Sequence, residues 1–209
     1  MRAMQLTELG KLPTLNTVPV PVPNAGEVQI KVHTCGMNFA DLLIIKGTYQ
    51  EKPTLPVTLG MEVCGTVTAI GEGVADLRVG QRVASYCGFG GLADYACVPA
   101  DVCVPVPDEM TDVDAAAFLI AYGTSHVALD YKAQMKPGAR LLVLGASGGV
   151  GLTAVELGKV MGAEVIAVAR GGDKLQVAKA AVAEHLLDSD TCNLRADVNV
   201  SVCRPGDYE

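Results

Sequence analysis

Short apolar runs separated by glycine and proline make up the first half of the chain. Val28, Ile30 and Val32 alternate with polar residues, and further strand-like runs cover 63–70, 81–85 and 95–98. This two-residue period is typical of half-buried strands. The prolines among residues 18–23 exclude a central strand there, because each lacks a ladder donor, so we expect an extended edge or connector. The pattern predicts a β-rich domain.

From about residue 112 the pattern changes to alternating helices and strands. Apolar runs at 141–144 and 165–168 predict two strands, and residues 186–187 predict a third. Ala154, Leu157, Gly158 and Met161 repeat with helical spacing between the first two strands, and Gly162 suits the end of that helix. Asp173 is expected to cap the next helix. This order predicts an α/β domain with a parallel sheet.

The segment between the first two of these strands has the composition of a phosphate-binding turn. Its spacing fits G-x-G-x-x-G with alanine in the first place, and glycine lets the backbone approach a pyrophosphate at a helix N-terminus. The alternative is an ordinary strand-to-helix turn without a nucleotide. We expect the dinucleotide to bind along Ala146, Ser147, Gly148, Gly149, Val150 and Gly151.

Residues after the second strand indicate which dinucleotide binds. An acidic residue there would take a ribose 2′-OH, whereas an arginine accommodates a 2′-phosphate. Here Ala169 is followed by Arg170, with Lys174 four residues further on. We therefore expect NADPH rather than NADH. The alternative is that both cations are solvated surface charges.

Composition narrows the class of protein. The chain has 209 residues, 50% of them hydrophobic, which is enough for one large or two small cores. A net charge of −7 argues against nucleic-acid binding, and the absence of a long apolar run or signal sequence predicts a cytoplasmic protein without a membrane span. Seven cysteines form no C-x-x-C pair and predict reduced thiols.

Six motifs occur in an order that is more specific than any one of them. They are 35–41, 46–49, 59–65, 79–83, 91–95 and 145–151. With these motifs the chain resembles the medium-chain dehydrogenase/reductase superfamily, and within it the zinc-free quinone oxidoreductases. The resemblance implies a GroES-like domain over 1–118 and an incomplete Rossmann domain, of three strands, over 119–209.

The resemblance also implies roles for single residues. Asn38, Asp41 and Tyr49 would lie near the hydride acceptor, with Tyr49 as a proton donor, and Thr124 would lie near the nicotinamide. The alternative is that Asn38 and Asp41 close turns and Tyr49 is a rim aromatic. Zinc-dependent relatives place Cys near the position of Asn38 and His at that of Met61, so we expect no metal.

The implied reaction is hydride transfer from NADPH to a quinone or an α,β-unsaturated carbonyl. Alternatives are a 2-enoyl thioester reductase and a non-catalytic chain that pairs with an intact form. Residues 198–209 depart from the family pattern, so we expect a truncated chain. Because only three strands of the Rossmann sheet are present, one wall of the cofactor crevice would be missing, and we expect NADPH to bind weakly or not at all. An exposed edge of the sheet would favour self-association, as a homo-oligomer or with a full-length form.

Overall fold

The computed structural model describes residues 1–181 and 183–193. The chain divides into two compact units, Met1–Ile120 and Ala121–Glu209, two residues beyond the boundary expected from the sequence. The departure expected over 198–209 lies outside the described residues. No helix in the described part of the chain is both long and apolar enough to cross a membrane.

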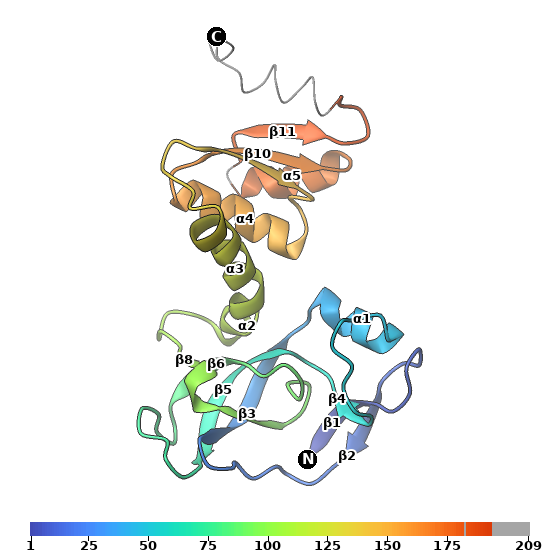
Figure 1. The fold of residues 1–209 in the computed structure, drawn as a ribbon, viewed down its shortest axis with the longest axis vertical. Helices are drawn as coiled ribbons and strands as arrows, with labels where there is room; N and C mark the ends of the chain where they lie inside the picture. The colour runs from blue at the N-terminus through green and yellow to red at the C-terminus, as the bar shows by residue number, and fades with distance from the viewer. Residues whose placement is uncertain (182, 194–209) are drawn as a thin grey trace. The chain divides into compact units, whose positions relative to one another are not determined.

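Unit 1 is built from antiparallel strands. One sheet has the order β2-β1-β4 and the other the order β7-β3-β5-β6-β8 (Figure 1). The strands are β1 (Arg2–Leu6), β2 (Thr14–Thr17), β3 (Glu27–Gly36), β4 (Val57–Thr58), β5 (Glu62–Ile70), β6 (Arg82–Tyr86), β7 (Tyr95–Pro99) and β8 (Cys103–Pro105). The predicted strands are therefore confirmed, and residues 18–23 form a connector outside any strand.

The core of the larger sheet follows from the two-residue period. Val28 and Ile30 on β3 are fully buried with Val63 and Val67 on β5. The two strands approach so closely that a Cβ on Gly65 would lie 2.2 Å from the Lys31 carbonyl oxygen. Only glycine fits where β3 and β5 approach each other this closely. The packing of the two strands therefore requires glycine at position 65.

Unit 1 also contains short helical segments. They are α1 (Phe39–Lys46), the 3-10 turn η1 (Ala100–Val102) and α2 (Asp112–Ala116). α2 begins where the hydroxyl of Thr111 accepts the Asp114 N–H at 3.1 Å, a side-chain cap, and it packs on β3 and β5. α3 (Phe118–His126) and the π-helical turn η2 (Val127–Lys132) follow.

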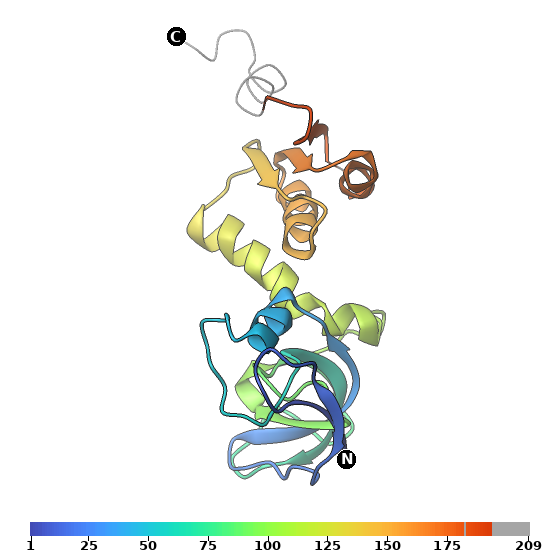
Figure 2. The same cartoon turned by 90° about the vertical axis from the view of Figure 1, so that its right-hand side faces the viewer.

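Unit 2 contains a parallel sheet with the order β11-β10-β9. Its elements are β9 (Arg140–Leu144), α4 (Gly149–Val160), β10 (Glu164–Ala169), α5 (Gly172–Ala180) and β11 (His185–Asp188). α4 packs on β9 and β10 and α5 on β10 and β11, and Figure 2 shows both helices on one side of the sheet. This is the predicted alternation of strand and helix.

Small residues let α4 lie close to the sheet. A Cβ on Gly158 would lie 2.5 Å from a methyl carbon of Leu141, and Val143, Val155 and Val165 form the buried core beside it. Gly162 ends α4 in the left-handed conformation, with φ +84°, as its position predicts.

One predicted cap is wrong. α5 begins at Gly172 with Gly171 as its N-cap, and Asp173 lies within the first turn. Gly171 has φ +80°, and its N–H donates to the Asp188 carboxylate at 3.0 Å. The carboxylate that organises this turn therefore comes from the end of β11, and local sequence could not reveal it.

Candidate nucleotide cleft and acceptor-side residues

A cleft of about 430 Å³ opens where β9 and β10 end. Its lining combines backbone, hydroxyl and cationic groups from three loops. The lining residues are Leu144, Gly145, Ser147, Val168, Ala169, Arg170, Lys174 and Ser189. In open parallel sheets, ligands bind outside the carboxyl ends of the strands, so this cleft has the expected location.

The glycine turn is tighter than its motif alone suggests. A Cβ on Gly151 would lie 2.2 Å from the Gly145 carbonyl oxygen, so Gly151 must be glycine. Ala146 is fully buried, and its N–H donates to the Val168 carbonyl at 3.0 Å. Gly145, the first residue of the 145–151 motif, makes the turn itself with φ +68°.

The helix N-terminus at this turn offers free donors. Gly148 is the N-cap of α4, with extended backbone, and Gly149 and Val150 begin the helix. The first N–H groups of a helix have no partner within it, and they carry the positive end of its dipole. Gly148, Gly149 and Val150 are exposed and Ser147 is half-buried, so this end of α4 is accessible to an anion.

A buried pair of hydroxyls fixes the first turn of α4. Ser125 Oγ donates to the Val150 carbonyl at 2.9 Å and lies 2.8 Å from Thr153 Oγ1. Thr124, expected near the nicotinamide, is the exposed neighbour of Ser125 on α3. Its role remains a prediction, while Ser125 and Thr153 are additional residues that shape the turn.

Both predicted cations line the cleft, and one of them pairs with an acid that the sequence interpretation did not include. Arg170 Nε lies 3.3 Å from Asp190 Oδ1. Asp190 follows β11, twenty residues further along the chain. The acid comes from a distant part of the chain, because the parallel pairing of β10 with β11 brings the two loops together.

In unit 1, Asn38 is held by a buried carboxylate. Asn38 Nδ2 donates to Glu62 Oε1 at 2.9 Å, and the Ile120 N–H donates to Glu62 Oε2 at 2.9 Å. Glu62 is 2% exposed, and this burial raises its pKa although the hydrogen bonds oppose the shift. Glu62 was missed as a site residue, and its signal was an acid inside the apolar run Met61-Glu62-Val63-Cys64.

Asp41 closes the start of α1. Its two carboxylate oxygens accept the N–H groups of Asn38 at 2.9 Å and Gly60 at 3.1 Å, and the residue is 1% exposed. These contacts give Asp41 a positioning role that holds the Asn38 loop against Gly60. Contact of Asp41 with an acceptor stays a prediction.

Tyr49 lies beyond α1 on a small hollow of about 40 Å³ that also includes Leu9, Ile44 and Leu55. It packs against the cluster of Leu6, Ile44, Leu59 and Met61. The neighbouring phenol of Tyr86 has a raised pKa, chiefly through burial and also through Glu51 and Tyr49. The structure thus places Tyr49 at a half-buried rim, and its role as a proton donor stays a prediction.

The residues at the expected zinc positions have other contacts. Met61 is buried in an apolar cluster, and Asn38 is bonded to Glu62. Within 1–181 and 183–193, no group of three or more His, Cys, Asp or Glu side chains is placed to hold a metal ion.

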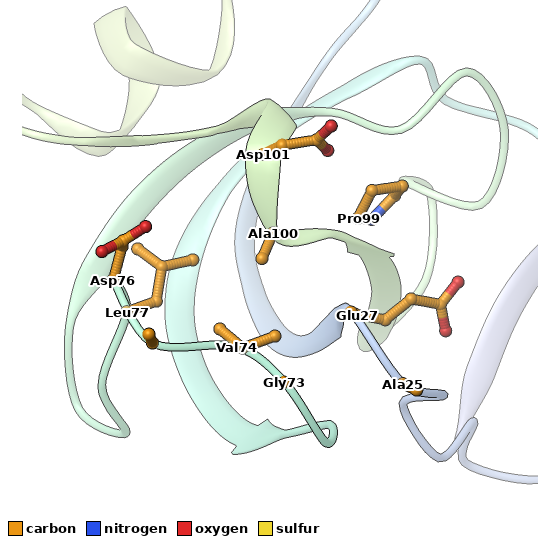
Figure 3. Close-up of a pocket in the computed structure, with 11 residues that line it drawn as sticks. Ala25, Glu27, Gly73, Val74, Asp76, Leu77, Pro99, Ala100 and Asp101 are labelled. Atoms are coloured by element: carbon orange, nitrogen blue, oxygen red, sulfur yellow. The ribbon is translucent and has the colours of Figure 1, made fainter.

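A separate hollow of about 490 Å³ lies in unit 1 (Figure 3). Val74, Leu77 and Ala100 give it apolar walls, while Glu27, Asp76 and Asp101 supply carboxylates. The Glu27 carboxylate accepts from Asn24 at 2.9 Å. The expected acceptor-side residues Asn38, Asp41 and Tyr49 lie elsewhere in the unit.

Comparisons with known proteins agree with this architecture. Residues 24–108 match the alcohol dehydrogenase GroES-like domain. A quinone oxidoreductase-like protein 2 homolog from Nematostella vectensis is 38% identical over 201 residues, covering 94% of this chain and 54% of the relative. The chain therefore spans about half the length of such curated relatives.

Solved structures give the same assignment. The quinone oxidoreductase from Thermus thermophilus, whose structure was also determined with NADPH, has a TM-score of 0.85 at 34% identity, covering 95% of this chain and 63% of the other. The CurK enoyl reductase has a TM-score of 0.88 at 27% identity, covering 96% of this chain and 63% of the other. The β-rich unit is thus GroES-like and the parallel unit Rossmann-like, as predicted, and the chain belongs to the quinone oxidoreductase group of the medium-chain dehydrogenase/reductase superfamily.

Proposed function

In place of the weak or absent binding expected from the sequence, we propose that this chain binds NADPH at the cleft of unit 2. We further propose that it acts in a zinc-independent reduction of a quinone or an α,β-unsaturated carbonyl. The single observation that carries the proposal is the cleft itself. It combines the glycine turn, the free end of α4 and two cations at the carboxyl ends of β9 and β10.

The residues present fit the dinucleotide. The backbone at Gly148 and Gly149 is open, and the adjoining N–H groups of α4 suit a pyrophosphate. Ser147, Arg170, Lys174 and Ser189 provide donors for a ribose that carries a 2′-phosphate. NADPH would supply the hydride, whereas the protein would supply binding and orientation.

Three residues of unit 1 support the proposal that this unit binds the hydride acceptor. Asn38 Nδ2 has one N–H bonded to Glu62, and its second N–H can donate to the carbonyl oxygen of an acceptor. Asp41 holds this loop in place through the N–H groups of Asn38 and Gly60. Tyr49 carries a hydroxyl that can donate a proton to a developing enolate.

Similarity to the CurK enoyl reductase favours a second candidate, reduction of a 2-enoyl thioester. The two candidates share the cofactor and differ only in the acceptor. A thioester substrate would need a groove for its long phosphopantetheine or CoA arm, whereas a quinone would not.

NADPH oxidation by the 209-residue chain, followed by the loss of reduced-nicotinamide absorbance, tests the proposal. Turnover with a panel of quinones or enones supports it, and turnover with crotonyl-CoA alone supports the second candidate. Binding of NADPH without turnover of any acceptor contradicts the catalytic part and indicates a non-catalytic nucleotide-binding protein. Failure to bind NADPH contradicts the proposal as a whole.

A further inference from the structure

An ion pair joins a residue that lines the nucleotide cleft, Arg170, to Asp190, the chain neighbour of the lining residue Ser189, at the place where the adenosine ribose is expected. Arg170 directly follows β10 and Asp190 lies just beyond β11, and the pairing of Ala169 with Asp188 brings both loops to one edge of the sheet. Arg170 Nε lies 3.3 Å from Asp190 Oδ1. Ser189, next to Asp190 in the chain, lines the cleft with Arg170 and Lys174.

The backbone around Asp190 is anchored. Asp188 Oδ1 accepts the N–H of Gly171 at 3.0 Å and the N–H of Asp190 at 3.1 Å. These two bonds lower the pKa of Asp188, so its carboxylate is charged at neutral pH. One carboxylate therefore joins the loop after β10 to the loop after β11, and it keeps Asp190 beside Arg170.

The two partners of the ion pair favour different nucleotides. A guanidinium binds a phosphate through paired donors, which suits a 2′-phosphate. A carboxylate accepts a hydrogen bond from a ribose 2′-OH but repels a 2′-phosphate, which is itself negatively charged. A guanidinium, the group that suits a 2′-phosphate, is thus paired with a carboxylate, the group that accepts a 2′-OH, although this carboxylate comes from the loop after β11 and not from the end of β10.

We propose that Asp190 determines cofactor specificity by competing with the 2′-phosphate of NADPH for Arg170 and by accepting the 2′-OH of NADH. The inference rests on the proposed function of the cleft. The inference goes beyond that function because it predicts that the chain prefers NADPH only moderately and that NADH binds at the same site.

The pair is exposed enough to exchange partners. The side chains of Arg170 and Asp190 are 77% and 55% exposed, and ion pairs this open contribute little net stability. A 2′-phosphate can therefore displace the carboxylate at small cost. The negative charge of Asp190 nevertheless remains nearby and weakens phosphate binding.

Calorimetric titration of the full chain with NADPH and with NADH tests this. Replacing Asp190 with asparagine keeps the size of the side chain and removes its charge. We expect the ratio of the NADH dissociation constant to that of NADPH to rise about three- to tenfold in Asp190→Asn, the effect of one unit charge at short range in water. The increase should shrink in high salt.

Two further variants test whether a change in the ratio of dissociation constants is specific to Asp190 and Arg170. Asp130→Asn removes the same charge from η2, outside the lining of the cleft, and should leave the ratio unchanged. Arg170→Gln should lower the ratio, because the donor for the phosphate is lost. An unchanged ratio in Asp190→Asn, or an equal change in Asp130→Asn, overturns the inference while NADPH binding itself stands. Binding of neither dinucleotide by the wild type overturns both the inference and the proposed function.

Discussion

The side-chain amide of Asn38 donates to the buried carboxylate of Glu62 across 2.9 Å, so the orientation of Asn38 depends on an acid at the start of β5. The same carboxylate accepts the Ile120 N–H, and a Cβ on Gly36 would lie 2.7 Å from it. The packing of Gly36 and the two donors therefore fix the carboxylate in one position. Through it they fix which end of the Asn38 amide points at Glu62.

Replacing Glu62 with glutamine should change how stability depends on pH. Burial raises the pKa of Glu62 above its ordinary 4.5, so the folded chain holds this proton more tightly than the unfolded chain does. The stability from this proton is present below the unfolded pKa and is lost as pH rises through the folded pKa. Glutamine does not titrate, so the advantage of wild type over Glu62→Gln should decline over that interval.

Urea unfolding of wild type and Glu62→Gln at a series of pH values from about 4 to 8 measures this difference. Glu72→Gln, an exposed change in the turn after β5, is the control and should show no such decline. A difference between wild type and Glu62→Gln that stays constant with pH would contradict the account.

Asp41→Asn should destabilise unit 1. The amide keeps one oxygen and places N–H donors where the carboxylate accepted a backbone N–H of Asn38 or Gly60. An unsatisfied buried donor costs about 1–3 kcal/mol. Thermal or urea unfolding checks this against Asp101→Asn, an exposed change on η1, and equal stabilities would show that Asp41 does not anchor the loop.

Two glycine substitutions separate folding from binding. Gly151→Ala places a Cβ 2.2 Å from the Gly145 carbonyl oxygen, so it should cost about 1–3 kcal/mol of stability. Gly148→Ala brings its Cβ to only 3.4 Å of the same oxygen, so the fold should accept it. The methyl group would nevertheless obstruct the approach of a pyrophosphate.

Unfolding and NADPH titration of these two variants form one experiment. We expect Gly151→Ala to lose stability and Gly148→Ala to keep it while its NADPH affinity falls at least severalfold. Undiminished affinity in a stably folded Gly148→Ala would show that the pyrophosphate does not lie over this turn.

Thr153→Val tests the hydroxyl pair under α4. Ser125 and Thr153 are 1% and 6% exposed, and their hydroxyl oxygens lie 2.8 Å apart, each also within hydrogen-bond distance of a backbone carbonyl, that of Val150 for Ser125 and that of Ala121 for Thr153. Valine removes one hydroxyl at equal shape, at a cost of about 1–3 kcal/mol. Thr153→Ser retains the hydroxyl and should cost less, and the reverse order of stability would contradict the pairing.

The sequence predicted helices and strands better than it predicted which side chains contact one another. Alternation of apolar and polar residues located β3, helical spacing located α4, and apolar runs located β5, β9 and β10. Gly151 and Gly162 were also identifiable, since local geometry demands glycine there. These features depend on residues close in the chain.

The missed contacts all depend on residues distant in the chain. Asp188 reaches Gly171 and Asp190 reaches Arg170 only because β10 and β11 pair in one register. Glu62 reaches Asn38 only because β5 pairs with β3. A local pattern can mark a buried acid such as Glu62, but it does not identify the distant residue that the acid contacts. The sequence therefore identified the cations of the cleft without the acid that pairs with one of them.

Titration of the isotopically labelled 209-residue chain with NADPH, followed by amide chemical shifts, tests the central claim most directly. We predict saturable shifts at Gly148, Gly149, Arg170, Lys174 and Ser189, which surround one cleft. Shifts that do not saturate, or saturable shifts confined to the hollow beside Asp76 and Asp101, would show that the glycine turn does not bind this dinucleotide.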